Sequence, residues 1–161
     1  MEMPKPQAEH QWLHKLIGEW KFEVVGSCAP GEEPHKHAGK EVVRSFGGLW
    51  TIGEATAEMP TGDASFSIMT LGYDPLKQRF VGNFVASMMN FLWQYEGSLD
   101  AAEKVLTLDT IGPSFAGDGT MATYQDIIEF IADDHRTLTS RVRGEDGSWT
   151  QFMEAHYYRQ R

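Results

Sequence analysis

Residues 41–58 read EVVRSFGGLWTIGEATAE and contain two runs of strand-forming side chains with a pair of glycines between them. The runs are Glu41 to Phe46 and Leu49 to Glu58. Glycine adopts positive φ without strain, so Gly47-Gly48 between two such runs is a signal for a tight hairpin with a primed turn. The stretch predicts two antiparallel strands that are neighbours in a sheet.

The same pattern extends along the chain from Glu19 onward. Runs of roughly six to twelve residues, rich in β-branched and aromatic side chains, alternate with clusters of Gly, Pro and Asp. Strands joined by short turns run antiparallel, and the sequence offers no crossover helices for a parallel sheet. We therefore predict an all-β protein, a closed antiparallel up-and-down β-barrel of about ten strands.

Helical spacing is found only near the N-terminus. Trp12, Leu13, Leu16 and Ile17 recur at the spacing of one helix face, and Gly18 provides a stop. We expect a short helix over residues 7–17 and the barrel over residues 18–161. Together these make a single domain, residues 1–161, which is a common size for one hydrophobic core.

The charge balance excludes several classes of partner. The chain of 161 residues has 14 Lys and Arg against 23 Asp and Glu, a net charge of −9. Such a surface repels the phosphates of nucleic acids and of anionic lipids. We expect neither nucleic acid nor a membrane as a partner.

The cysteine count and the N-terminus indicate the compartment. A single cysteine, Cys28, allows no intrachain disulfide, and the first eleven residues lack the apolar run of a secretory signal. We therefore expect a cytoplasmic protein. No neighbouring base is placed to activate the Cys28 thiol, so no catalytic role is expected for it.

Some strands are apolar on both faces. Phe66 and Ile68 share one face of their run, while Met69 and Leu71 share the other. One face belongs to the barrel interior, and the other then needs a cover. The cover is either the N-terminal helix or another subunit, which makes a homodimer one of the expectations.

The opening of the barrel resembles that of the calycins, the lipocalin and fatty-acid-binding-protein group. A helical turn leads into Gly18-Glu19-Trp20 at the first predicted strand, as in that group. Calycins usually pack a late arginine across this tryptophan. The resemblance therefore implies that Arg159 or Arg161 lies over Trp20 as a cation–π contact that closes the barrel.

The whole chain is similar to a bacterial family known as domain of unknown function 1579. The matching strings include GGLW at 47–50, MTLGYDP at 69–75, YEGSLD at 95–100 and DDHR at 133–136. This resemblance implies the barrel fold. It brings no established activity, catalytic residue or cofactor.

A barrel of this size encloses room for one small ligand. We expect an apolar cavity with a few polar groups, lined by Trp50, Phe84, Met88, Trp93, Tyr95 and Tyr124, with His156 as a polar contact. The alternative for each of these residues is an ordinary place in a filled core.

Histidine pairs are a weak signal for metal. His10 and His14 stand four apart on the predicted helix, and His35 and His37 stand two apart near Pro34. Neither pair has an evident third ligand. We interpret the first pair as a solvated helix face and the second as exposed loop residues, and expect no metal or cofactor.

Acidic residues inside the strands favour an alternative function, that of an enzyme. They are Glu54, Glu96, Asp109, Asp126, Glu129 and Glu154. One that faces the cavity beside a tyrosine or His156 would have a raised pKa and could act as general acid or base. Alternation places Asp109 outside, opposite Leu106 and Leu108, and leaves Asp126 undecided.

Three functions remain open from the sequence. The first is binding of a small hydrophobic or amphipathic molecule in the barrel. The second is an enzyme of lyase or isomerase type that uses a buried carboxylate and a tyrosine. The third is a filled barrel that serves as a dimeric interaction scaffold.

Overall fold

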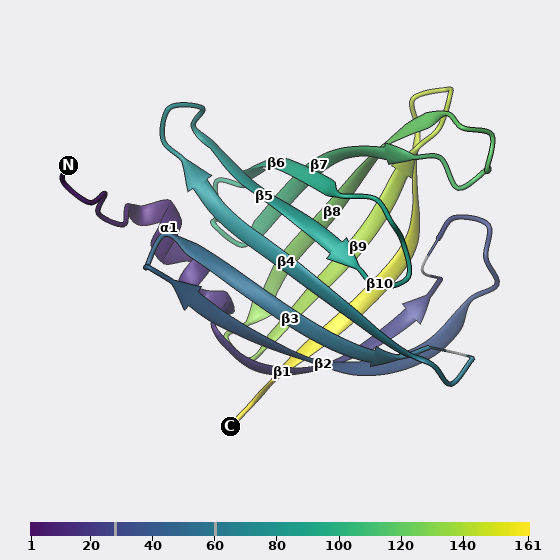
Figure 1. The fold of residues 1–161 in the computed structure, drawn as a ribbon, viewed down its shortest axis with the longest axis horizontal. Coiled ribbons are helices and arrows are strands. Elements are labelled where there is room, and N and C mark those ends of the chain that lie inside the picture. Colours follow the sequence, from purple (N-terminus) through teal and green to yellow (C-terminus); the bar gives the residue numbers. More distant parts are fainter. Residues whose placement is uncertain (28, 60) are drawn as a thin grey trace.

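The computed structural model describes residues 1–27, 29–59 and 61–161. Ten strands lie within them: β1 Gly18–Gly26, β2 His35–Phe46, β3 Trp50–Glu58, β4 Ala64–Asp74, β5 Arg79–Ala86, β6 Trp93–Leu99, β7 Val105–Pro113, β8 Met121–Ala132, β9 His135–Arg143 and β10 Trp149–Gln160. Each strand pairs antiparallel with its neighbours in the chain, and β1 pairs with β10 (Figure 1). The predicted closed up-and-down barrel is confirmed.

The hairpin between β2 and β3 has the predicted glycine turn. Phe46 pairs with Trp50, and three residues connect them. Gly47 and Gly48 have φ of 66° and 77°, a region that residues with a Cβ rarely adopt. The two glycines therefore allow the chain to reverse within three residues.

The N-terminal helix is shorter than the predicted 7–17. Helix α1 covers Ala8–Leu13, and a 3-10 helix, η1, covers His14–Leu16. The helix ends because Ile17 is extended and Gly18 has φ of 140°, where a Cβ would lie 2.6 Å from the Arg159 guanidinium. No helix among the described residues is long and apolar enough to cross a bilayer.

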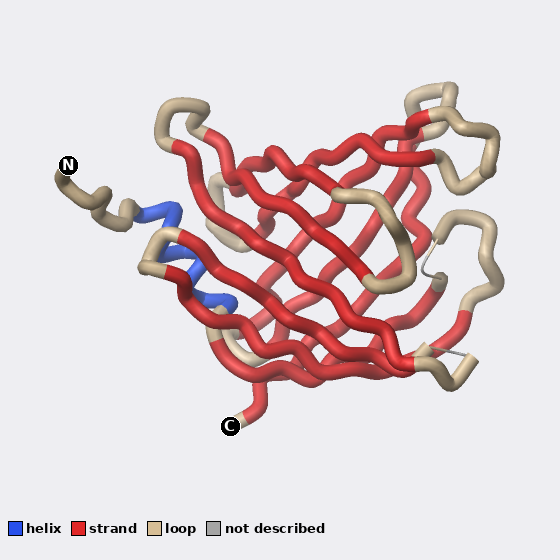
Figure 2. The backbone as a smooth tube through the Cα atoms, in the orientation of Figure 1, coloured by secondary structure: helices blue, strands red, loops and turns tan. Residues whose placement is uncertain are grey.

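Helix α1 closes one end of the barrel (Figure 2). Trp12 packs edge-on against Phe80 and Phe130, and its Nε1 donates to the carbonyl of Glu103 in the turn between β6 and β7. Leu13 is 1% exposed and belongs to the same core cluster. The helix is therefore part of the barrel's hydrophobic core.

Trp20 joins the two ends of the chain. Its Nε1 donates to the carbonyl of Leu16 at 2.8 Å, and the Arg159 guanidinium lies 4.3 Å from its ring. Arg159 also donates to the carbonyls of Ile17 and Lys15 at 2.6 and 2.8 Å. The late arginine that the calycin resemblance implies is therefore Arg159, and it ties β10 to the start of β1.

The outer face of β4 is apolar and uncovered. Phe66 and Ile68 are 58% and 40% exposed, while Met69 and Leu71 point inward. Helix α1 contacts β3 and β4 but does not bury Phe66 or Ile68, so it is not their cover. The homodimer stays a prediction.

The core position of the helix leads to a stability prediction. Leu13→Ala should lower the free energy of unfolding by about 2–5 kcal/mol, because it removes buried methyl groups and leaves a cavity. Gln11→Ala, at an exposed position of the same helix, should change it by less than about 0.5 kcal/mol. Urea unfolding followed by tryptophan fluorescence measures both. Equal effects of the two substitutions would show that the helix is not part of the core.

Candidate functional site

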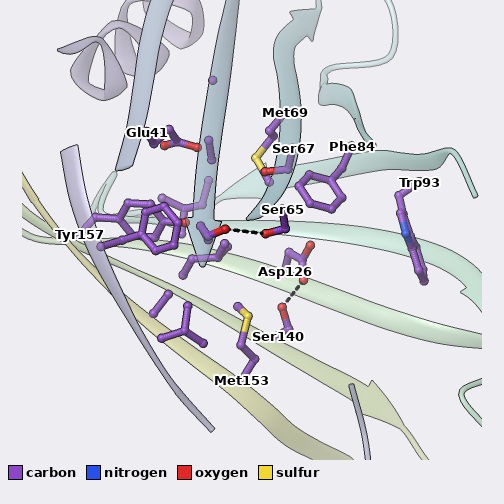
Figure 3. Close-up of a pocket in the computed structure, with 18 of the residues that line it drawn as sticks. Glu41, Ser65, Ser67, Met69, Phe84, Trp93, Asp126, Ser140, Met153 and Tyr157 are labelled. Carbon is purple, nitrogen blue, oxygen red and sulfur yellow. Dashed lines mark hydrogen bonds between the residues drawn. The ribbon is translucent and has the colours of Figure 1, made fainter. Parts of the chain in front are cut away.

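The barrel contains a cavity of about 190 Å³. Small inward-facing residues leave this space open on the wall that β3 and β4 form; they are Gly53, Ala55, Ala57, Ser65 and Ser67. Larger side chains face them from other strands, among them Phe84, Trp93 and Met153 (Figure 3). The cavity lies where side chains are too small to fill the barrel.

The open side of the cavity lies at the end away from α1. Met88 and Met89 follow β5, Phe115 follows β7, and all three line the cavity. The ribbon places these loops at the opposite end of the barrel from α1 (Figure 1). Met88 is also 48% exposed, so it faces both the cavity and the solvent. This end is therefore the mouth.

Four of the predicted cavity residues line the cavity: Phe84, Met88, Trp93 and Tyr124. Trp93 packs edge-on against Tyr124 with ring centroids 5.2 Å apart. The Trp93 ring lies over Gly112, where a Cβ would come within 2.0 Å of it. The absence of a side chain at Gly112 therefore fixes the place of the Trp93 ring.

Two predicted cavity residues, Trp50 and His156, lie on the outer face instead. Inward residues alternate with outward ones along a strand, and Thr51 and Tyr157 are the inward neighbours. Trp50 is 38% exposed and packs over Gly72. His156 lies with its Nδ1 3.0 Å from the Nε2 of His135. The prediction that these two line the cavity is wrong.

The histidine pairs are also placed differently from the prediction. His10 is 4% exposed, packs edge-on against Tyr73 and accepts a hydrogen bond from the backbone of Gln7. His37 lies in β2 and lines the cavity, where burial and the nearby His35 lower its pKa. The helix face is therefore not solvated at His10, and His35 and His37 are strand residues rather than loop residues.

Asp126 is a buried acid on the cavity wall. Its Oδ1 accepts a hydrogen bond from the Ser140 hydroxyl at 2.5 Å, and its Oδ2 accepts one from the Tyr95 hydroxyl. Tyr95, which was also predicted to line the cavity, is 3% exposed and is not among the residues that line it. Its hydroxyl contacts the lining through Asp126. Burial raises the pKa of Asp126, although the two hydrogen bonds oppose the shift. Burial also raises the pKa of Tyr95.

A buried ion pair stands elsewhere on the cavity wall. Arg136 donates to the carboxylate of Glu41 at 2.5 Å, and their side chains are 4% and 12% exposed. The Arg136 guanidinium lies 4.5 Å from the Trp20 ring and 4.0 Å from the Tyr157 ring. The charge of Arg136 is therefore balanced by Glu41, and its flat faces are covered by aromatic rings.

Sequence reasoning missed both members of this ion pair. Glu41 shares one face of β2 with Val43, but Val42 makes the opposite face apolar too. The alternation therefore does not indicate which face points into the barrel. Arg136 lies on the face of Leu138, directly after the polar turn sequence Asp133-Asp134-His135, so it resembles one more exposed charged residue of that turn. Its spacing of two from Leu138 was the available signal.

The described residues contain neither a cluster of metal ligands nor a cysteine. No group of three or more His, Cys, Asp and Glu side chains among them is arranged to hold a metal ion. Cys28, for which no catalytic role was expected, lies outside the described residues.

The ion pair leads to a second stability prediction. Arg136→Met should lower the free energy of unfolding by about 3–5 kcal/mol, because it leaves Glu41 buried without a cation. Adding Glu41→Gln should restore part of that loss. Arg44→Met is the control: Arg44 pairs with Glu54 on the exposed surface at 3.7 Å, so its loss should cost at most about 1 kcal/mol. Urea unfolding measures all three, and a cost for Arg136→Met no larger than the control contradicts the account.

The raised pKa of Asp126 predicts a dependence of stability on pH. The folded state binds the proton of Asp126 more tightly than the unfolded state does, so protonation of Asp126 stabilises the fold. This contribution is complete below the ordinary Asp pKa of 3.8. It is lost as the pH rises through the folded-state pKa. The free energy of unfolding of the wild type, relative to Asp126→Asn, should therefore fall from acid toward neutral pH. Unfolding curves across this range test the trend, and a relative stability that rises with pH would refute it.

Solved structures of similar fold have low sequence identity with the chain. The protein Rv2717c from M. tuberculosis matches with a TM-score of 0.67 and 14% identity, over 98% of this chain and 100% of that one. The S-type phycobiliprotein lyase CPES from Guillardia theta matches with a TM-score of 0.57 and 11% identity, over 96% of this chain and 94% of that one. The protein EF1p2_mFAP2b bound to DFHBI matches with a TM-score of 0.50 and 12% identity, over 94% of this chain and 98% of that one. At these identities the likeness is one of fold.

Among curated proteins, none matches the chain. A family model does match, and it covers residues 5–159, nearly the full length. The family is described as protein of unknown function (DUF1579). The resemblance carried by the sequence strings is thereby confirmed, and the chain belongs to the DUF1579 family.

Proposed function

We propose that the protein binds a small hydrophobic or amphipathic molecule in the barrel cavity. The observation that carries the proposal is the space of about 190 Å³ that the inward side chains leave open. An engineered apolar cavity of about 150 Å³ in another protein admits benzene or xenon. A compact molecule of one or two rings therefore suits this cavity better than a long acyl chain.

The lining supports an apolar body with a small polar part. Phe84, Trp93 and Met153 provide apolar surface, while Asp126 and Ser140 provide polar atoms (Figure 3). Known small-molecule sites combine mostly apolar walls with a few placed polar groups in this way. The methionines at the mouth suit a ligand entrance because their flexible side chains adapt to different shapes.

A fold neighbour also supports the proposal. It was solved bound to DFHBI, so a barrel of related shape accommodates a small molecule. The filled-barrel alternative, a dimeric interaction scaffold, requires a core without such a space. The exposed Phe66 and Ile68 favour a contact surface but do not argue against a ligand inside.

A second candidate function is an enzyme of lyase or isomerase type. It is favoured by Asp126, a buried carboxylate with a raised pKa that is hydrogen-bonded to Tyr95. An acid of this kind can exchange a proton with a bound substrate. One fold neighbour is named a lyase, which agrees with this candidate. Both candidate functions require that a small molecule binds in the cavity.

Cavity filling tests the binding proposal. Indole, a neutral two-ring compound, should bind the wild type and raise its melting temperature, because a ligand of the folded state stabilises it by mass action. Ala55→Phe puts a ring into the cavity and should weaken indole binding by about tenfold or more. Thr56→Phe, the next residue on the outer face of β3, is the matched control and should leave binding unchanged.

Isothermal titration calorimetry gives the affinities, and near-ultraviolet circular dichroism checks that both variants are folded. Absence of saturable binding to the wild type, both of indole and of single-ring aromatic compounds, would overturn the proposal. So would equal loss of binding in the two variants, because the loss would then not depend on the cavity.

A further inference from the structure

We propose that the ligand carries a protonated amine beside its compact apolar body, and that the amine pairs with Asp126 in the cavity. This inference rests on the proposed binding function and deepens it, because it names the chemical class of the ligand. Its basis is the balance of charge and of hydrogen-bond donors inside the barrel.

The charges that face the cavity do not cancel. Among the described lining residues, the acidic side chains are Glu41 and Asp126, and the basic ones are Arg136 and His37. Burial lowers the pKa of His37, which favours its neutral form. Arg136 is paired with Glu41 at 2.5 Å. Asp126 forms no ion pair with any side chain in the described ranges. An ionised Asp126 therefore lacks a protein cation, and a ligand cation can supply one.

The hydrogen bonds of Asp126 leave acceptor positions open. Each carboxylate oxygen has two lone pairs, and each accepts one hydroxyl proton, from Ser140 or from Tyr95. The donors are thus already directed at the acid, and the remaining lone pairs are free to accept. A ligand that donates hydrogen bonds fits this place, and an ammonium group has three donors.

The aromatic lining also suits a cation. Phe84, Trp93 and Tyr124 line the same cavity as Asp126. The faces of aromatic rings attract ammonium groups, most strongly where water is excluded. The net charge of −9 further raises the concentration of cations near the protein. Charge and hydrogen-bond donors therefore favour the same class of ligand, and the aromatic lining agrees with it.

An anionic ligand fits the cavity less well. Arg136 Nε is buried without a hydrogen-bond partner and could donate to an acceptor on a ligand. The rest of that guanidinium is bound to Glu41 and lies against Trp20 and Tyr157. A carboxylate in the cavity would meet two protein carboxylates for one guanidinium. A neutral acceptor group on the ligand is compatible with Arg136, whereas a negative charge is not.

Three compounds of nearly equal size separate these possibilities: benzylamine, benzyl alcohol and benzoate. Calorimetric titration of the full chain at neutral pH measures the affinity of each, and benzylamine is protonated under these conditions. We expect benzylamine to bind about tenfold more tightly than benzyl alcohol or better, and benzoate to bind most weakly. The apolar ring is the same in all three, so the ranking reports the charge preference.

Two variants locate the preference. Asp126→Asn should weaken benzylamine binding by about tenfold or more and change benzyl alcohol binding by less than about threefold. Asp109→Asn is the matched control, since Asp109 lies exposed on the outer face of the neighbouring strand β7. It should leave the ranking of the three compounds intact. If Asp126→Asn does not fold, the ranking on the wild type decides the question.

The outcomes distinguish this inference from the proposed function. Binding of benzyl alcohol as tight as that of benzylamine would overturn the amine preference and leave the binding function standing. Binding of indole without binding of benzylamine would have the same consequence. If neither indole nor any of the three compounds binds, the proposed function fails and the inference fails with it. Equal loss of benzylamine binding in Asp126→Asn and Asp109→Asn would remove Asp126 as its partner.

Discussion

The pairing of β1 with β10 is the constraint on which the rest of the structure depends. It joins the two ends of the chain, from Gly26 opposite Met153 to Glu19 opposite Gln160, and so turns a row of hairpins into a closed barrel. Closure removes both sheet edges and gives each strand one inner and one outer face. Trp20 and Arg159 stand at this seam, and Arg159 also holds the end of the helical segment in place.

The cavity follows from closure together with the size of the inward residues. A barrel of about eight strands is just filled by its side chains, and ten strands enclose more room. On most strands large residues such as Trp93 and Tyr157 occupy that room. On β3 and β4 the inward positions include Gly53, Ala55 and Ser67, whose side chains are too small to fill the interior. The helical segment seals one end of the barrel, so the remaining space opens at the other.

The fold is predictable from the sequence because its signals are local and repeated. Runs of strand-forming residues, the Gly47-Gly48 turn and the absence of crossover helices each point to an antiparallel barrel. The family strings then identify the whole chain. The pattern also places Asp109 outside, opposite Leu106 and Leu108, and Phe84 inside, on the face of Phe80, in agreement with the structure.

The same reasoning fails where both faces of a strand look alike. Trp50 is a large apolar residue and His156 a polar one within strands, so the sequence favours a place in the cavity lining for both. The alternation of inward and outward residues puts both on the outer face instead. Periodicity leaves Asp126 undecided because apolar residues flank it on both faces. Its place depends on partners from β6 and β9, Tyr95 and Ser140, which are far away in the sequence. Long-range contacts of this kind cannot be read from periodicity.

The central claim is that the barrel holds an open cavity with apolar walls, and xenon tests it most directly. Xenon enters apolar cavities without needing any specific polar contact. A crystal of the protein pressurised with xenon should show an ordered atom inside the barrel, against the side chains of Phe84, Trp93 and Met153. A barrel interior that takes up no xenon, with these side chains in contact with the β3 and β4 wall, would contradict the account.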